Sequence, residues 1–314
     1  MSEIHKFLFE GMPVRGVLVR LTDAWTEVLH RHAAGSNGAY PLPVQNLLGE
    51  MLVAATLMQS NIKFNGALLL QIMGDGPLKL AVAEVQADFG VRATATVMGA
   101  IGADASLSAM VNRSQGGKCA ITLDPKERFP GQQAYQGVVP LSVDSQNLQR
   151  LSAVLEHYMR QSEQLETTLV LAADADVAAG LLIQRLPSEG SGNLGATLRP
   201  DQAGVGDEDY QRIALLASSL KSEELLTLDA DSMLRRLFWQ EQLVRFEPAA
   251  GDPVPHFSCT CSRARVQKMI LGLGAVEAQS ILAERGEIEV GCDFCGAQQR
   301  FDAVDVAQVF REGL

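Results

Sequence analysis

Apolar and polar residues alternate along several short stretches of the first two hundred positions, which is the period of a half-buried β-strand. The clearest turn between two such stretches is Gly74-Asp75-Gly76-Pro77, so the runs on either side of it are expected to pair as a hairpin. The predicted strands are a strand or hairpin over His5–Leu21, then Gly66–Met73, Leu78–Val85, Gly90–Met98, Cys119–Leu123, Gly137–Leu141, Thr167–Ala172 and Gly180–Leu186.

Apolar residues at helical spacing occur between these strands. Thr22 can cap a helix that ends near His32, and Gly35-Ser36-Asn37-Gly38 is expected to be a loop. Pro41 and Pro43 precede a strongly apolar helix that ends near Ser60. A third helix is expected over Gln146–Gln161. Because strands and helices do not alternate strictly, the pattern favours an α+β fold, with helices packed on a mixed sheet, over a doubly wound sheet.

A change in composition follows near position 188. Glycine, proline and polar residues dominate positions 188–206, which indicates a domain boundary. Positions 207–246 then look helical and amphipathic, and Asp229 or Asp231 can cap the second helix. Such a segment either packs permanently on a domain or covers a surface in one state and leaves it in another. We therefore divide the chain into an α+β core domain (1–200), a helical linker (201–252) and a C-terminal domain (253–314).

The C-terminal domain is small and contains most of the cysteines. Its pattern predicts helices over Arg265–Leu273 and Ala275–Arg285, strands over Glu287–Val290 and Gly296–Asp302, and a last helix over Val304–Phe310. A unit of about sixty residues has little core of its own. A bound metal would therefore supply much of its folding free energy.

The composition of the chain indicates in which cellular compartment the protein works and which classes of binding partner it excludes. No secretory signal and no apolar run of about eighteen residues is found, since the closest run, Leu47–Met58, contains Glu50. We therefore expect a cytoplasmic protein, in which clustered thiols are reduced and available to metals. The net charge of −11 and the lack of a basic tract argue against a nucleic-acid-binding protein.

Four of the five cysteines form two close pairs, Cys259-x-Cys261 and Cys292-x-x-Cys295. Two thiol pairs about thirty residues apart can place four sulfurs around one tetrahedral Zn²⁺, and this is the expected cofactor. Cys-x-x-Cys followed by glycine is the usual zinc-knuckle form, whereas Cys-x-Cys is rarer and more specific. Arg263, Arg265 and Lys268 follow directly and can offset the negative charge of four thiolates.

The same four sulfurs can also form two disulfides, so the motif supports two chemical states. Zinc holds the cysteines as thiolates, the form that oxidants attack. An oxidant that pairs the sulfurs would release the metal and unfold a unit that folds because of it. A structural zinc ribbon that never changes state is the alternative, and the spacing alone does not decide between them.

The sequence around these cysteines resembles one known family. The stretch Phe257-Ser-Cys-Thr-Cys-Ser-Arg263 and the stretch Glu287-Ile-Glu-Val-Gly-Cys-Asp-Phe-Cys-Gly296 look like the zinc domain of the redox-regulated bacterial holdase chaperones of the 33-kilodalton heat-shock family. Further similar stretches follow the same order along the chain: Gly74–Leu78, Tyr135–Leu141, Glu163–Thr168, Gly180–Gln184 and Met233–Trp239.

This resemblance implies a mechanism. The reduced, zinc-bound form would be inactive, and peroxide with unfolding stress, or hypochlorite, would form the disulfides Cys259–Cys261 and Cys292–Cys295. Zinc release would unfold the C-terminal domain and the metastable linker. The oxidised protein, expected to be a homodimer, would then bind unfolding client proteins without ATP and later pass them to an ATP-dependent foldase system. It would not be an enzyme.

Residues of the linker are the candidate client-binding groups. Once the linker is displaced, Leu225, Leu226, Leu237, Phe238 and Trp239 are expected to contact clients.

Two other classes compete with this interpretation. A thiol-disulfide oxidoreductase would place its Cys-x-x-Cys at the start of a helix after an early strand, whereas here the pair follows a C-terminal strand. A static zinc-ribbon nucleic-acid-binding protein would need a basic unit, whereas positions 253–314 carry at least as many acids as bases. Cys119 stands apart from the cluster and is expected to be a buried core residue, with a third redox thiol as the alternative.

Overall fold

The structure is a computed structural model that describes residues 1–35, 38–127, 129, 131, 133–187, 205–249 and 251–312. The predicted boundary at position 200, and part of the predicted loop at 35–38, lie outside these residues. The chain divides into two compact units. Unit 1 comprises Met1–Leu29 and Tyr40–Phe257, and unit 2 comprises His30–Ala39 and Ser258–Leu314. The linker residues that the structure describes belong to unit 1, while the three-part division of the chain stays a prediction.

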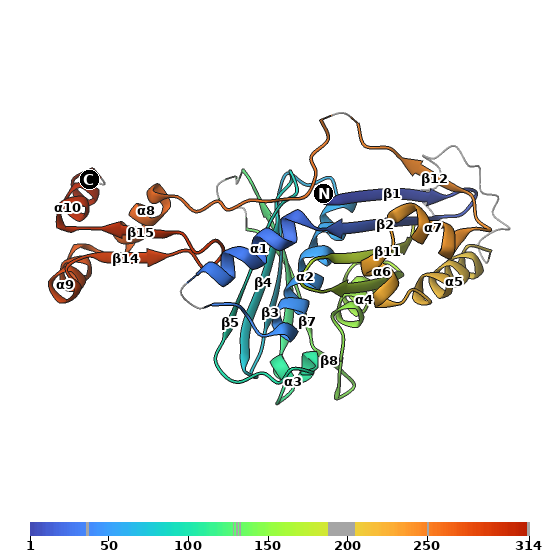
Figure 1. The fold of residues 1–314 in the computed structure, drawn as a ribbon, viewed down its shortest axis with the longest axis horizontal. Helices are drawn as coiled ribbons and strands as arrows, with labels where there is room; N and C mark the ends of the chain where they lie inside the picture. Colours follow the sequence, from blue (N-terminus) through green and yellow to red (C-terminus); the bar gives the residue numbers. More distant parts are fainter. Residues whose placement is uncertain are drawn as a thin grey trace. The chain divides into compact units, whose positions relative to one another are not determined.

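A five-stranded antiparallel sheet forms one layer of unit 1 (Figure 1), in the order β10-β11-β2-β1-β12. Its strands are β1 (Glu3–Phe9), β2 (Val14–Leu21), β10 (Thr167–Ala173), β11 (Ala178–Arg185) and β12 (Leu243–Phe246). Both faces are apolar, because successive side chains along a strand point to opposite sides. On β2, Val17 and Val19 pack in one core cluster and Val14 and Leu18 in another.

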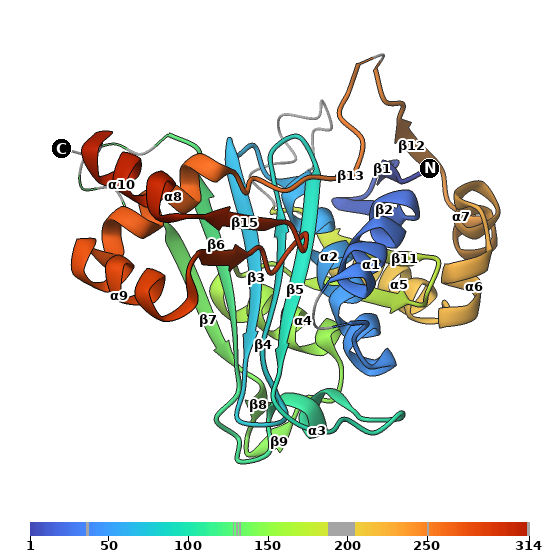
Figure 2. The same cartoon turned by 60° about the vertical axis from the view of Figure 1, so that its left-hand side comes forward.

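A six-stranded sheet forms a second layer, in the order β13-β5-β4-β3-β6-β7 (Figure 2). Its strands are β3 (Gly66–Met73), β4 (Leu78–Val85), β5 (Gly90–Val97), β6 (Lys118–Pro125), β7 (Tyr135–Pro140) and β13 (His256–Phe257). The pair β13–β5 is parallel and the other pairs are antiparallel, so the sheet is mixed. The predicted α+β class is confirmed, with two large sheets in place of one.

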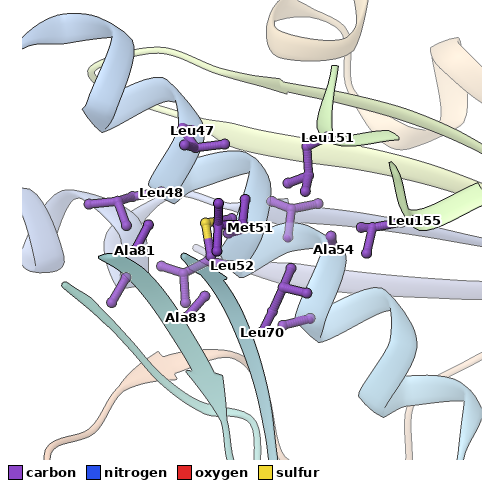
Figure 3. Packing of buried hydrophobic residues seen from close by; sticks show 14 of the residues in the cluster. Leu47, Leu48, Met51, Leu52, Ala54, Leu70, Ala81, Ala83, Leu151 and Leu155 are labelled. Atoms are coloured by element: carbon purple, nitrogen blue, oxygen red, sulfur yellow. The ribbon is translucent and has the colours of Figure 1, made fainter. Parts of the chain in front are cut away.

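The apolar helix α2 (Leu42–Asn61) contacts strands of both sheets and forms the centre of the main core. Fifteen of its residues are buried on all sides of the helix, as expected for a helix enclosed by protein. Leu48, Met51 and Leu52 face Ala81 and Ala83 of β4, and Leu151 and Leu155 of α4 (Leu151–Ser162) complete the packing (Figure 3). The remaining helices of this region are α1 (Asp23–Ala34) and the short α3 (Leu107–Val111).

The other face of the five-stranded sheet is covered by the linker helices (Figure 1). These are α5 (Val205–Ser218), α6 (Ser222–Thr227) and α7 (Ala230–Phe238). The predicted cap of α7 is confirmed at Asp229, whose side chain accepts a hydrogen bond from the Ser232 backbone N–H. The helices place a continuous apolar stripe against the sheet, so the linker shares a core with it.

Unit 2 contains α8 (Arg263–Leu273), α9 (Ala275–Arg285), the hairpin of β14 (Ile288–Gly291) and β15 (Gln298–Phe301), and α10 (Ala303–Glu312). All five elements match those that the sequence predicts. Ser262 caps α8 and the left-handed Gly286 ends α9. The hydrophobic cluster formed by these helices and strands has six buried residues, which is a small core for a folding unit.

Three expectations about elements are wrong. The helix predicted from Gln146 begins at Leu151, because Gln146–Asn147 forms β9 and pairs with β8 (Ser142–Val143) across a tight turn. The segment predicted as helical to position 246 ends in the strand β12, which pairs with β1. Pro43 lies in the first turn of α2 and does not precede the helix, since proline fits where no intrahelical N–H is needed.

Candidate metal centre and client-binding surface

The four predicted metal ligands come together in unit 2. The Sγ atoms of Cys259, Cys261, Cys292 and Cys295 all lie within 4.8 Å of one another. Two of these separations join the two halves of the motif: 3.6 Å between Cys259 and Cys292, and 3.3 Å between Cys261 and Cys295. All five cysteines of the chain are among the described residues, and none forms a disulfide.

This arrangement fits a zinc ion. Four sulfurs at the usual Zn–S distance define a tetrahedron with edges of about 3.8 Å, close to the separations found. Thiolate sulfur is a ligand that zinc prefers, and four protein ligands leave no open coordination position. The cluster is therefore suited to a closed structural site.

The Cys-x-x-Cys half lies in the turn that joins β14 to β15. Gly296 N–H donates to the Cys292 carbonyl at 2.8 Å, and Cys292 N–H donates to the Ala297 carbonyl at 3.0 Å. Gly296 has φ +69°, a left-handed conformation that favours glycine. The glycine of the motif thus allows the turn that directs both sulfurs to one point. The pair does not begin a helix, unlike the oxidoreductase motif.

The Cys-x-Cys half is held by the helix that follows it. Arg265 donates from Nη1 to the Thr260 carbonyl and hydroxyl oxygens, at 3.1 and 2.6 Å. Arg263 turns away to pair with Asp305 at 2.8 Å and to lie over the Phe301 ring at 4.1 Å. Arg265 therefore fixes the residue between the two ligands, while Arg263 joins α8 to α10. The sequence predicts a basic environment here but not these separate partners.

Burial and mutual hydrogen bonds shift the pKa values of three of the four thiols in different directions. Burial opposes ionisation of Cys259, but hydrogen bonds from the Cys261 backbone and from the other three thiols outweigh it and lower the Cys259 pKa to about 7. Burial and the hydrogen bonds to Cys295 and Cys259 raise the pKa of Cys261. Burial also raises the pKa of Cys292. Of these three thiols Cys259 ionises most readily, and a divalent cation would be needed to hold Cys261 and Cys292 ionised near neutral pH.

The candidate client-binding residues lie in the linker of unit 1, and four of the five pack on the sheet. Leu225, Leu237 and Phe238 are buried, and Leu226 is partly buried against the same cluster. The Phe238 ring lies 5.0 Å from that of Phe9, centroid to centroid. The fifth residue, Trp239, is 72% exposed. Four of these residues would therefore have to move before a client could reach them.

Polar contacts that the sequence does not predict also hold the linker. Arg20 of β2 donates to the carbonyl oxygens of Leu225 and Leu226, at 2.7 and 3.1 Å. Within the linker, Arg236 pairs with Glu224 at 2.6 Å. Exposed ion pairs contribute little free energy, so the apolar contacts supply most of the attachment.

The fifth cysteine, Cys119, belongs to the core of unit 1. Cys119 is fully buried on β6, and burial raises the pKa of its thiol to about 12, so the predicted core role is confirmed.

Within the part of the chain that the structure describes, no helix combines the length and apolarity needed to cross a membrane.

Known proteins resemble this chain along nearly its whole length. A family model described as "Hsp33 protein" matches residues 2–302. A protein of Chromobacterium violaceum named "33 kDa chaperonin" is 43% identical over 309 residues, covering 98% of this chain and 94% of that protein. One of the same name from Shewanella woodyi is 39% identical, with 98% and 96% covered. The crystal structure of a 33 kDa chaperonin from Thermotoga maritima superposes with a TM-score of 0.73 at 20% identity, covering 100% and 99%, which shows a shared fold.

Proposed function

The chain belongs to the Hsp33 family of 33 kDa chaperones, and from that premise we propose that it is a redox-regulated holdase. In the reduced state the four cysteines bind one Zn²⁺ and the protein does not bind clients. Oxidation converts the thiolates to two disulfides and releases the metal. The protein then holds unfolding proteins without ATP and acts as a chaperone, not as an enzyme.

The observation that supports the switch most directly is the proximity of four sulfurs in a unit with few other stabilising contacts. The apolar cluster of unit 2 has six buried residues. A core of this size offsets little of the conformational entropy that folding costs. Metal binding would then account for much of the unit's folding free energy, so loss of the ion would unfold it.

The proposed disulfides join near neighbours, Cys259 with Cys261 and Cys292 with Cys295. Sulfurs of different halves also lie close together, at 3.6 and 3.3 Å, as expected in a cluster where all four sulfurs surround one point. Once oxidation of a thiolate breaks its bond to zinc, the metal no longer holds the four sulfurs together, and sulfurs close in sequence meet more often than sulfurs over thirty residues apart. Formation of each disulfide removes two electrons from two thiolates. One hydrogen peroxide molecule accepts them together with two protons from solvent and is reduced to two water molecules.

The linker supplies the surface that the switch would release. The apolar stripe of α5–α7 and the sheet face beneath it form one cluster. If unfolding of unit 2 destabilises the linker, both apolar faces become available to clients at once.

We further propose that the oxidised protein is a homodimer, that clients pass to an ATP-dependent foldase system, and that the protein works in the cytoplasm.

The test measures zinc, free thiols and chaperone activity in the same samples. The reduced protein and protein treated with hypochlorite, or with peroxide at elevated temperature, are each mixed with a chemically unfolded client, and light scattering follows its aggregation. We expect suppression only after zinc and four thiols per chain are lost. Peptide mapping should find the two near-neighbour disulfides.

Matched variants identify the thiols that matter. Cys292→Ser should abolish the oxidant response, whereas Cys119→Ala should keep it, because Cys119 is buried in the core of unit 1. Equal activity in the reduced and oxidised natural protein would overturn the switch but leave the zinc site intact.

A further inference from the structure

A cavity of about 320 Å³ lies in unit 1 and is lined by residues of both sheets and of α2 and α4. This volume is at the lower end of the range for small-molecule sites, about 300–1,000 Å³. Its walls are mainly apolar, with Met58 from α2, Leu68 from β3, Leu123 from β6, Met159 from α4 and Leu182 from β11. Ile62 and Tyr135 also line it and are partly exposed, so the cavity has access to solvent.

One wall of this apolar cavity carries a cation. Arg15 of β2 donates from Nε to Gln184 Oε1 at 3.0 Å, and its Nη2 donates to the same oxygen. Gln184 is only 2% exposed and is held by its own donation to Thr167 Oγ1 at 2.8 Å. A buried amide thus fixes the guanidinium at the cavity wall, and the N–H groups of Nη1 have no hydrogen-bond acceptor among the described residues.

Within the described part of the chain, the charge of Arg15 is not balanced by a carboxylate. Among the residues that the structure describes, no Asp or Glu forms an ion pair with Arg15. Buried charges are normally paired, because removal from water is costly. Burial lowers the pKa of Arg15 accordingly, and its charge also lowers the pKa of Lys6, after the larger effect of Lys6 burial.

The carboxylate that does line the cavity is already engaged. Glu163, at the end of α4, accepts hydrogen bonds from the Tyr158 hydroxyl at 2.7 Å and the Tyr135 hydroxyl at 3.2 Å. It adds a negative group to the part of the lining formed by α4 and β7. A ligand with a second negative charge would be repelled there, whereas an alkyl chain would not.

We propose that this cavity is a binding site for an alkyl monocarboxylate, the chemical class of medium-chain fatty acids. The ligand carboxylate accepts hydrogen bonds from the free N–H groups of Arg15, and the alkyl chain lies among the leucine, isoleucine and methionine side chains. Charge-assisted bonds to a guanidinium fork give orientation, and burial of methylene groups gives most of the affinity. The site is independent of the metal centre.

Calorimetric titration of the reduced, zinc-bound full chain with decanoate, decanol and decylamine tests this site. We expect one decanoate per chain, bound at least about tenfold more tightly than decanol, which is the effect of one charge-assisted hydrogen bond. Between hexanoate and decanoate, each added methylene should tighten binding by about fourfold. Equal affinity for decanoate and decanol, or no binding of decanoate, would overturn the proposal.

Variants separate the site from general hydrophobic binding. Arg15→Met should weaken decanoate binding by about tenfold or more, while Arg160→Met, at an exposed arginine of α4 outside the lining, should not. Because loss of Arg15 leaves the buried Oε1 of Gln184 without a donor, a second variant keeps the arginine: Leu123→Trp fills the cavity. It should abolish binding while circular dichroism stays unchanged. Normal decanoate affinity in either variant would refute the assignment, and neither result depends on chaperone activity.

Discussion

Gly296 has a backbone conformation on which the metal centre depends. Its φ of +69° is one that residues with a Cβ adopt at a cost of roughly 1–2 kcal/mol. Gly296→Ala should therefore weaken zinc binding by about tenfold, measured by competition with a chromophoric chelator under reducing conditions. Gly272→Ala is the control, because Gly272 lies in α8 with open space around its Cα and alanine favours a helix. Equal affinities in the two variants would contradict this role for Gly296.

Glu50 of α2 should make the stability of unit 1 depend on pH. Burial, only partly offset by Arg150, raises the Glu50 pKa to about 7, against about 4.3 in an unfolded chain. Between these values the folded protein keeps a proton that the unfolded chain has lost, so stability falls as pH rises through this window. Glu50→Gln should thus unfold at a higher temperature than the natural protein at pH 8, by a few degrees, and at a similar temperature near pH 4.5.

The fluorescence of Trp25, which is fully buried in unit 1, can follow this unfolding. Glu247→Gln, at an exposed position, is the matched control and should have no effect at either pH. An equal shift for Glu50→Gln at both pH values would show that ionisation is not the cause.

At the level of residues, the sequence identifies side chains whose chemistry is local. The four cysteines and the cap at Asp229 are recognised by spacing to near neighbours. The role of Arg20 cannot be recognised in this way, because its hydrogen-bond partners, Leu225 and Leu226, lie more than two hundred positions away in the sequence. The role of Arg15 cannot be predicted from the sequence for the same reason. Gln184 lies next to Arg15, and the cavity forms, only when β2 pairs with β11.

Among the elements, the linker is the part whose attachment decides the proposed activity. The double variant Leu237→Ala with Phe238→Ala removes two buried side chains from the sheet face, each worth about 2–5 kcal/mol. It should lower the oxidant exposure needed for activation and weaken client binding once active, both measured by light scattering. Leu215→Ala, at an exposed position of α5, is the control. Unchanged activation and unchanged client binding in the double variant would remove these residues from the proposed mechanism.

The prediction of elements fails where a segment depends on a distant partner. The strand β12 is short and mostly exposed, and only pairing with β1 makes it a strand. The start of α4 was misplaced because Asp144 and Ser145 adopt positive φ values and turn the chain into the β8–β9 hairpin. Strands bounded by strong turns, such as β3 and β4, match their predicted limits. Local signals therefore suffice for most elements of the core.

For the whole molecule, the two units should respond differently to metal removal. A strong chelator under reducing conditions should unfold unit 2, with loss of the helical signal of α8–α10, because its core is small. Unit 1 has a far larger core and should keep the fluorescence of its buried Trp25. Added zinc should restore the lost signal. Persistence of the full helical signal in metal-free protein would contradict a metal-dependent fold.

The central claim is that loss of zinc from unit 2 releases the linker of unit 1. Hydrogen exchange of the full chain, read by mass spectrometry before and after oxidation, tests it most directly. We predict that amides of α7 and β12 are protected in the reduced, zinc-bound protein and exchange rapidly once both disulfides form. Amides of the buried helix α2 should stay protected throughout. An oxidised, zinc-free protein that suppresses aggregation while α7 and β12 remain protected would contradict the account.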